Sequence, residues 1–354
     1  MDCEIKIDEI DVQILKTVLS NPRVSFAEIA RQCKMSTNAI RMRFKSLEEA
    51  GVITGAKLHV SPKILGFGCT ASLNIQARVN DEESVYDYLQ SIPSVFLCFH
   101  WLSKWNFNCV VGLKDTAELA DLVEQIKRHS GVIDVQSYIW VEQKNVDFPK
   151  NLIIKPTDKP ICTTEFLQNE TNQKFAFITQ PVDNLEYLHY LKESFNMDQT
   201  DLRILRILSE NASIPFRKIA KQLDISTQSV IRRYSNLKKN LKLFSSTSLN
   251  LKKLGYESII VLFITALPQF ETSQVFDKLS QIPNVITLHK CFGSIDILAI
   301  APLTNFKQLF DLKQRVVNTL GVKSIEISMG EPFSSWPLNP FASLFEKLSS
   351  EENQ

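Results

Sequence analysis

Two runs of polar and basic residues have the spacing of a helix face that contacts duplex DNA. In the first run, Ile40, Phe44 and Leu47 recur at helical intervals and would face a protein core. The positions between them carry hydroxyl, amide and cationic groups, which can donate hydrogen bonds to base edges and neutralise phosphates. The DNA contacts predicted for this run are Ser36, Thr37, Asn38, Arg41, Arg43 and Lys45.

The second run repeats this arrangement 190 positions further along the chain, with apolar residues again at the inward positions. Its predicted DNA contacts are Ser226, Thr227, Gln228, Arg232, Arg233 and Lys238. Gln228 stands where the first run has Asn38, and Ile231 stands where it has Arg41. Because different side chains reach different base edges, we predict an asymmetric DNA site rather than a perfect palindrome.

The other residue types that carry chemistry are not grouped. The seven cysteines are scattered and form no Cys-x-x-Cys pair, so the sequence predicts neither a zinc site nor a disulfide framework. No Ser/His/Asp, Cys/His or glycine-rich phosphate-loop pattern is present. We therefore predict no metal, no cofactor and no catalytic residue, and a protein that is not an enzyme.

The composition indicates a globular protein with local rather than global charge. Lys plus Arg number 40 and Asp plus Glu number 39, so affinity for nucleic acid must come from local patches. No stretch reaches the roughly 18 to 20 apolar residues that span a bilayer. We expect a cytoplasmic protein with no membrane partner.

Three helical segments between residues 8 and 55 would position the first run. The first segment has an apolar face and ends near Asn21-Pro22, because proline interrupts a helix. Ser25, with Glu28 three positions later, predicts a capping box at the start of the second segment. Ser36 would cap the third, and residues 51–56 would form a short wing that closes the unit. This order is that of a winged helix-turn-helix.

The whole pattern occurs twice, since residues 11–16 recur at 201–206 in the same register. After each helical unit the periodicity changes to alternating strands and helices. The predicted strands are 70–79, 95–103, 107–113 and 132–141, and later 259–265, 285–292, 295–301 and 322–329. The predicted helices are 82–91 and 116–129, and later 270–281 and 305–319.

The order βαββαβ is the ferredoxin-like arrangement, in which both helices cover one face of an antiparallel sheet. The other face must also be hidden, and pairing with another copy of the sheet would hide it. The predicted fold class is therefore α+β, with two copies of a winged helix-turn-helix, each followed by a ferredoxin-like effector domain.

The repeat divides the chain into six parts. We predict winged helix-turn-helix units at 1–55 and 196–247, effector domains at 56–143 and 248–330, a linker at 144–195 and a tail at 331–354. In the linker, Leu185, Leu188, Leu191 and Phe195 have helical spacing and predict a short helix. The tail carries Trp336 and other apolar residues, which indicates docking onto a partner or onto the body of the protein.

A set of residues in the first half carries a family resemblance: Asp11, Ile14, Leu15, Asn21, Pro22, Arg23, Ile29, Ala30, Ser36, Thr37, Ile40, Arg43, Leu47, Glu48, Gly51, Val52, Ile53, Leu65 and Gly66. Their order and spacing resemble the leucine-responsive and asparagine-synthase regulator family (Lrp/AsnC), in the tandem-fused form found in archaea. The resemblance covers nearly all of both halves. It implies a DNA-binding transcriptional regulator, modulated by a small effector such as an amino acid. It also implies a homo-oligomer or an intramolecular pseudo-dimer of effector domains.

The family resemblance also implies an effector site. Members of the family bind effectors near a Gly-x-x-Asp turn, and Gly293-Ser294-Ile295-Asp296 matches it. Gly293, Ser294 and Asp296 are therefore the predicted effector-binding residues. The first half has Ser103-Lys104-Trp105-Asn106 at this place and departs from the pattern. There, a tight β-turn with Trp105 as core filler is the competing interpretation.

Two other functions fit parts of the sequence. Some proteins of this fold resemble sirohaem decarboxylases, and His100, Trp101, Trp105 and Asn108 could serve a tetrapyrrole substrate. A lone histidine in a strand of mixed polarity is more often structural, and an enzyme would have no use for two basic recognition helices. A third hypothesis is an effector sensor that acts only through protein partners. Weak, salt-insensitive binding to DNA would favour it.

Overall fold

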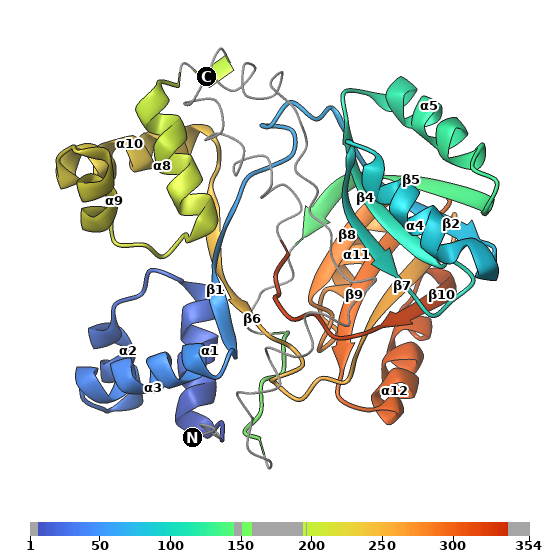
Figure 1. The fold of residues 1–354 in the computed structure, drawn as a ribbon. Helices are drawn as coiled ribbons and strands as arrows, with labels where there is room; N and C mark the ends of the chain where they lie inside the picture. The colour runs from blue at the N-terminus through green and yellow to red at the C-terminus, as the bar shows by residue number, and fades with distance from the viewer. Residues whose placement is uncertain (1–5, 145–150, 158–193, 196, 339–354) are drawn as a thin grey trace.

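The computed structural model describes residues 6–144, 151–157, 194–195 and 197–338. Two three-helix units lie on one side of a large curved sheet, and a two-stranded ribbon runs between the units and the sheet (Figure 1). The helices of the first unit are α1 (Glu9–Ser20), α2 (Phe26–Cys33) and α3 (Thr37–Glu49). Those of the second unit are α8 (Gln199–Glu210), α9 (Phe216–Leu223) and α10 (Thr227–Asn240).

Capping side chains set where these helices begin. Ser36 and Ser226 cap α3 and α10, because each Oγ accepts a hydrogen bond of 3.1 Å from the backbone N–H three residues later. Ser25 caps α2, but the carboxylate of Glu28 binds side chains of its own helix, so the capping box predicted there is incomplete. Reciprocal capping boxes form instead at the starts of α1 and α8.

The strand that follows each helical unit pairs with its counterpart from the other half. Strand β1 (Ile53–His59) and strand β6 (Phe244–Leu249) form an antiparallel ribbon. Each helical unit packs on the strand of the other half. Thr247 Oγ1 donates a 2.7 Å hydrogen bond to the Val18 carbonyl, and the Ala212 N–H donates one of 3.0 Å to the Ala56 carbonyl. The predicted wing, residues 51–56, begins against its own unit, where the Val52 N–H donates a 2.9 Å hydrogen bond to the Leu47 carbonyl. The segment then enters a ribbon shared by both halves.

The remaining strands form one antiparallel sheet of eight, in the order β10-β7-β9-β8-β5-β2-β4-β3. The first half contributes β2 (Cys69–Ala77), β3 (Val95–His100), β4 (Phe107–Leu113) and β5 (Val132–Lys144). The second half contributes β7 (Ser258–Ala266), β8 (Thr287–Gly293), β9 (Ile297–Leu303) and β10 (Val322–Gly330). Each half has its fourth strand beside its first, then its third and second, which confirms the ferredoxin-like βαββαβ order.

Helices cover one face of this sheet. The sheet is curved, and residues on its inner face from both halves share one core. The helices are α4 (Glu82–Ser91), α5 (Thr116–Lys127), α11 (Thr272–Leu279) and α12 (Phe306–Val317), with a 3₁₀ turn at Val79–Asp81 that ends the predicted strand 70–79 at Ala77. The halves join through β5 and β8, and at the far edges Leu102 forms a bridge with Met329. The pairing that hides the second face thus occurs within one chain. The inner face contributes to a core that includes Leu97, Tyr138 and Phe263.

Parts of the predicted linker and tail pack on the body. Asn151 donates side-chain hydrogen bonds to carbonyls of the second half, and Tyr256 Oη donates to the Ile153 carbonyl at 2.7 Å. In the tail, Trp336 forms an antiparallel β-bridge with Leu249 of the ribbon, so this part of the tail packs on the body of the protein. Of the helix predicted at 185–195, only 194–195 lies within the described residues, and it is helical. Within the described ranges, no helix is long and apolar enough to span a bilayer.

Candidate nucleic-acid interface

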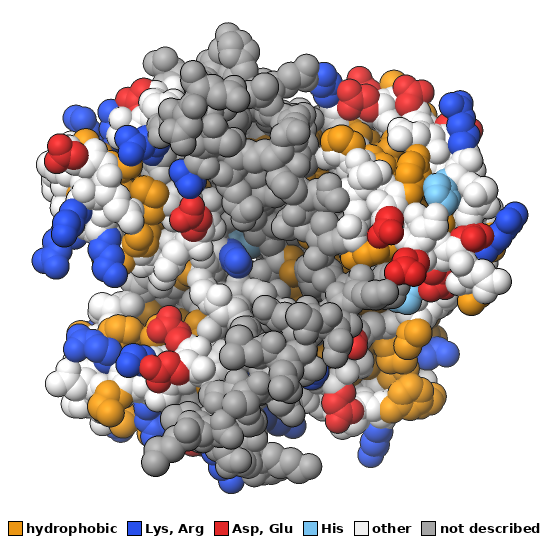
Figure 2. Space-filling view, in the orientation of Figure 1, with side chains coloured by type: hydrophobic (Ala, Val, Ile, Leu, Met, Phe, Trp, Pro, Cys, Tyr) orange, Lys and Arg blue, Asp and Glu red, His pale blue; other side chains and the backbone are white. Residues whose placement is uncertain are grey.

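The two predicted recognition faces lie at the surface of α3 and α10. Ser36, Asn38, Arg41 and Lys45 are exposed, and Thr37 is partly exposed. The second unit repeats this pattern, with Ser226, Gln228, Arg232 and Lys238 exposed and Thr227 partly exposed. Figure 2 shows Lys and Arg side chains on the surface of both helical units. The inward residues Ile40, Leu47, Val230 and Leu237 are buried, so core packing fixes which face each helix presents.

Arg43 and Arg233 differ from the other predicted contacts, because each binds two carboxylates of its own unit. Arg43 Nη1 lies 2.8 Å from Asp8 Oδ2 and 2.9 Å from Asp11 Oδ1. Arg233 makes the equivalent pairs at 2.7 and 2.8 Å with Asp198 and Asp201. Hydrogen bonds to these two carboxylates raise the pKa of Arg233. Arg43 therefore connects α3 to the capping box of α1, and Arg233 connects α10 to the capping box of α8.

Arg41 is held more loosely on the outward face of α3. Its Nη1 donates a 3.2 Å hydrogen bond to Asn38 Oδ1, and its guanidinium lies 5.9 Å from the centroid of the Phe26 ring. Both side chains are exposed, so this contact with Asn38 can be exchanged for contacts to bases or phosphates. Lys45 forms an exposed pair with Glu49 at 3.0 Å, which has little energetic weight in water.

The two helical units also touch each other through Arg23, which the sequence analysis named in the family pattern without predicting this contact. Its guanidinium lies 4.3 Å from the centroid of the Phe216 ring and 5.2 Å from that of Tyr234, both in the second unit. Burial lowers the pKa of Arg23. The residue at the equivalent position of the second half is Ser213, so the contact is asymmetric. This break in the repeat is the signal from which the contact could have been found.

The predicted effector turn lies at the joint between the two halves. Gly293 has φ of 141°, and an added Cβ would lie 2.6 Å from the Ser137 carbonyl oxygen, so glycine is required where β8 meets β5. The Asp296 carboxylate accepts a 2.7 Å hydrogen bond from the backbone N–H of Ala266. Ser294 is exposed. These contacts account for Gly293 and Asp296 structurally, and the effector role of the turn stays a prediction.

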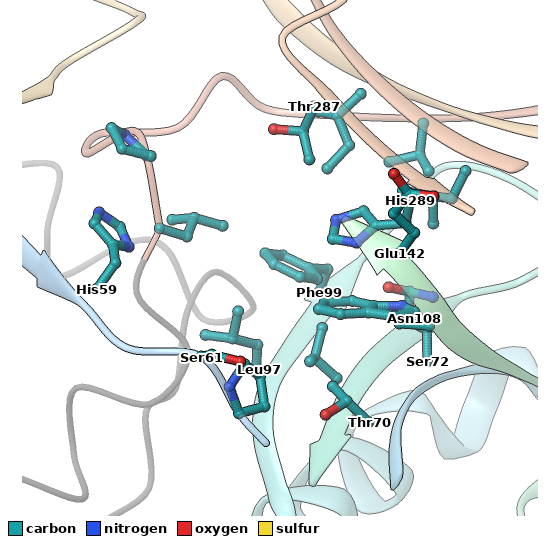
Figure 3. A pocket seen from close by; sticks show the side chains of 18 of the residues that line it. His59, Ser61, Thr70, Ser72, Leu97, Phe99, Asn108, Glu142, Thr287 and His289 are labelled. Atoms are coloured by element: carbon teal, nitrogen blue, oxygen red, sulfur yellow. The ribbon is translucent and has the colours of Figure 1, made fainter. Parts of the chain in front are cut away.

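The four residues considered for a tetrapyrrole substrate are not brought together as one set. His100 Nε2 lies 3.1 Å from Glu82 Oε2, and the buried Trp105 donates a 3.4 Å hydrogen bond from Nε1 to Glu326. Trp101 and Asn108 line a cavity of about 460 Å³ between the ribbon and the sheet (Figure 3). Asn108 Nδ2 donates to Asn74 at 2.7 Å and to Tyr138 at 2.8 Å.

Family models match both helical units. Residues 7–54 match a model described as winged helix-turn-helix DNA-binding, and residues 197–238 match the AsnC-type helix-turn-helix domain.

Curated relatives are named as regulators. The HTH-type transcriptional regulator Ptr1 of Methanocaldococcus jannaschii is 30% identical over 34% of this chain and 80% of the relative. The HTH-type transcriptional regulator LrpA of Pyrococcus horikoshii is 30% identical over 39% of this chain and 98% of the relative. The regulatory protein AsnC of Escherichia coli is 36% identical, and the match spans 25% of this chain and 59% of AsnC.

A solved structure matches the chain as a whole. The siroheme decarboxylase NirDL aligns over 98% of this chain and 100% of its own, with a TM-score of 0.57 and 14% sequence identity. Identity at this level shows a shared fold, with both halves in the same arrangement. It does not transfer the chemistry of that enzyme.

Proposed function

Because this chain belongs to the Lrp/AsnC family of transcriptional regulators, we propose that it binds specific DNA sequences through both α3 and α10 of one chain. The observation that carries the proposal is the pair of exposed polar and basic faces, held by buried residues on the opposite side of each helix. The predicted contacts other than Arg43 and Arg233 are exposed or partly exposed, and their hydroxyl, amide and cationic groups are of the types that bind base edges and phosphates.

The distance between the two recognition helices is set within the chain. The ribbon β1–β6 and the contact of Arg23 with Phe216 connect the units directly. We propose that the helices enter successive major grooves, whose centres lie about 34 Å apart on one side of the duplex. The two faces carry different side chains, so the two half-sites differ in sequence. Such a regulator acts in the cytoplasm, and a small effector such as an amino acid would modulate it.

Salt-dependent binding to DNA tests this proposal. The purified full chain is mixed with fragments of genomic DNA, bound fragments are selected and sequenced, and the dissociation constant of the best fragment is measured by mobility shift. We expect one enriched asymmetric motif. Its affinity should fall steeply between about 50 and 200 mM salt, because binding releases counterions from the phosphates and this release is less favourable at higher salt. Weak binding without an enriched motif, insensitive to salt, would instead support a sensor that acts through protein partners.

A second candidate function, a tetrapyrrole decarboxylase, is favoured by one observation, the fold shared with NirDL over nearly the whole chain. A colour test separates the two candidates. The protein is titrated with iron-loaded tetrapyrrole while the absorption spectrum and released carbon dioxide are followed. Stoichiometric binding with release of carbon dioxide would support the enzyme. A spectrum equal to that of the free tetrapyrrole would support the regulator.

A further inference from the structure

The cavity of about 460 Å³ between the ribbon and the sheet has the size of a small-molecule site, since such sites span roughly 300 to 1,000 Å³. Four described parts of the chain line it: the end of β1, the start of β6 with Lys242 and Phe244, the inner face of both halves of the sheet, and residues 333–338. Figure 3 shows His59 across the cavity from Phe99 and His289. Both halves of the chain therefore contribute to one site.

The wall is rich in aromatic rings. The ring centroids of Trp140 and His289 lie 4.0 Å apart, and those of Phe99 and Trp101 lie 5.5 Å apart. Three of the four tryptophans in the sequence, Trp101, Trp140 and Trp336, line this space. Aromatic walls on several sides favour a flat, unsaturated ring, which can stack or meet their edges.

Two buried polar atoms on the wall have no hydrogen-bond partner among the described residues. They are Trp101 Nε1 and His289 Nδ1, and each residue is only 4% exposed. An indole N–H can only donate, and a buried donor left unsatisfied costs about 1–3 kcal/mol. Burial lowers the pKa of His289 to about 3, so its ring is neutral near pH 7, and Nδ1 is a donor in the tautomer that carries the proton there. A bound acceptor group would satisfy such donors.

The charged side chains at the edge of the cavity indicate whether the ligand's acceptor group is neutral or anionic. Lys63 and Lys242 line the cavity and are exposed, and among the described residues of the wall Glu142 supplies the one carboxylate. An excess of positive charge at the mouth favours an anion over a cation of equal shape.

We propose that this cavity binds one planar aromatic carboxylate, with its ring between the aromatic walls and its carboxylate accepting hydrogen bonds from the wall. The inference deepens the proposed function, because it makes this ligand the effector of the regulator. It places the effector inside the chain rather than at the turn that contains Gly293.

The cavity lies beside the segment that leads from α10 into the ribbon. His59 of β1 stacks on Phe244 of β6 at 4.6 Å, and its Nε2 lies 2.7 Å from Ser246 Oγ. Phe244 and Lys242 line the cavity and follow α10 by only a few residues. A ligand against this part of the ribbon therefore contacts the segment that fixes the position of α10. It would shift DNA affinity by binding one arrangement of the helical units better than another.

Binding is tested on the full chain with two probes that share a ring, 1-naphthoate and 1-naphthylmethylamine. Calorimetry gives the stoichiometry, and quenching of tryptophan fluorescence reports occupancy beside Trp101, Trp140 and Trp336. We expect one naphthoate per chain, bound at least tenfold more tightly than the amine. His289→Leu should weaken naphthoate about tenfold, the effect of one lost buried hydrogen bond. His129→Leu, outside the cavity, is the matched control and should change nothing.

A second variant, at the surface, keeps the test valid if His289→Leu does not fold. Lys242→Gln leaves the core intact and should reduce the preference for naphthoate over the amine by several-fold. The proposal is overturned if neither probe binds below millimolar concentration. It is equally overturned if both probes bind alike and neither substitution at the cavity alters naphthoate affinity.

Regulation is tested separately by measuring DNA affinity with and without saturating naphthoate. We expect a change of at least threefold in the wild-type chain, and in His289→Leu the same change should require about tenfold more naphthoate. Naphthoate bound with unchanged DNA affinity would refute the effector role. Absence of specific DNA binding would refute the proposed function, while the probe titration would still decide whether the cavity is a ligand site.

Discussion

At the scale of single residues, the cations of the recognition helices fall into two kinds with different consequences. Arg41 and Arg232 are exposed on the outward faces, whereas Arg43 and Arg233 bind carboxylates within their own units. Periodicity alone could not separate the two kinds. The capping carboxylates come within reach only when the three helices pack together.

Replacing Arg41 with alanine should weaken specific DNA binding by about tenfold or more without loss of stability. The side chain is exposed and would contact a base edge or phosphate, and such a contact contributes about 1–3 kcal/mol. If it contacts a phosphate, the slope of log affinity against log salt should fall by about one. Mobility shifts over a salt series measure both quantities. Arg128→Ala, an exposed arginine after α5, is the control and should bind as the wild type does.

Replacing Arg43 with alanine should lower the free energy of unfolding by about 2 kcal/mol. The substitution leaves the Asp11 carboxylate, 5% exposed, without its ion pair. Urea unfolding followed by circular dichroism measures the change, with Arg41→Ala as the variant of equal charge. Equal stability of the two variants would contradict the connecting role of Arg43.

The two buried histidines should make the protein less stable in mild acid. Burial lowers the pKa of His59 to about 4 and that of His289 to about 3, from 6.5 in the unfolded chain. Between these values the unfolded state binds more protons, so stability is lost as pH falls below about 6.5. At pH 5 each histidine should cost about 2 kcal/mol relative to pH 7.5. Urea unfolding at both pH values should show a smaller difference in His289→Leu than in His129→Leu.

At the scale of elements, the sequence predicts which segments form helices and strands but not which strands become partners. Strand β4 (Phe107–Leu113) matches its prediction at both ends, because alternation and turn residues mark it locally. The partner of β1 lies in the other half of the chain. Either ribbon strand could satisfy its local pattern by folding back, so only the packing of the whole chain selects the exchange. The cavity was missed for the same reason, since its wall comes from distant segments.

Replacing Arg23 with leucine should relax the preference for one spacing between half-sites. The guanidinium holds the two helical units together by its contacts with Phe216 and Tyr234. In the wild type, inserting five base pairs between half-sites turns one groove away from its helix and should cost at least tenfold in affinity. In Arg23→Leu this penalty should shrink. Ser213→Ala, the equivalent position of the second half, is the control and should keep the full penalty.

At the scale of the whole molecule, one chain contains both parts of a two-fold assembly. The continuous sheet joins the halves through β5 and β8, and the ribbon joins their helical units. Because the halves are not identical, each can differ in its task. Arg23 has no equivalent in the second half, and the turn at Gly293 has a different sequence in the first. Such asymmetry is available to a fused pair and not to two identical subunits.

The central claim is that α3 and α10 of one chain read two adjacent, unlike half-sites. Hydroxyl-radical footprinting on the selected DNA tests it directly, with wild type, Arg41→Ala and Arg232→Ala compared at saturating protein. We expect two protected stretches with centres about one helical turn apart. Arg41→Ala should weaken protection at one stretch and Arg232→Ala at the other. Protection that neither substitution alters, or two identical half-sites, would contradict the account.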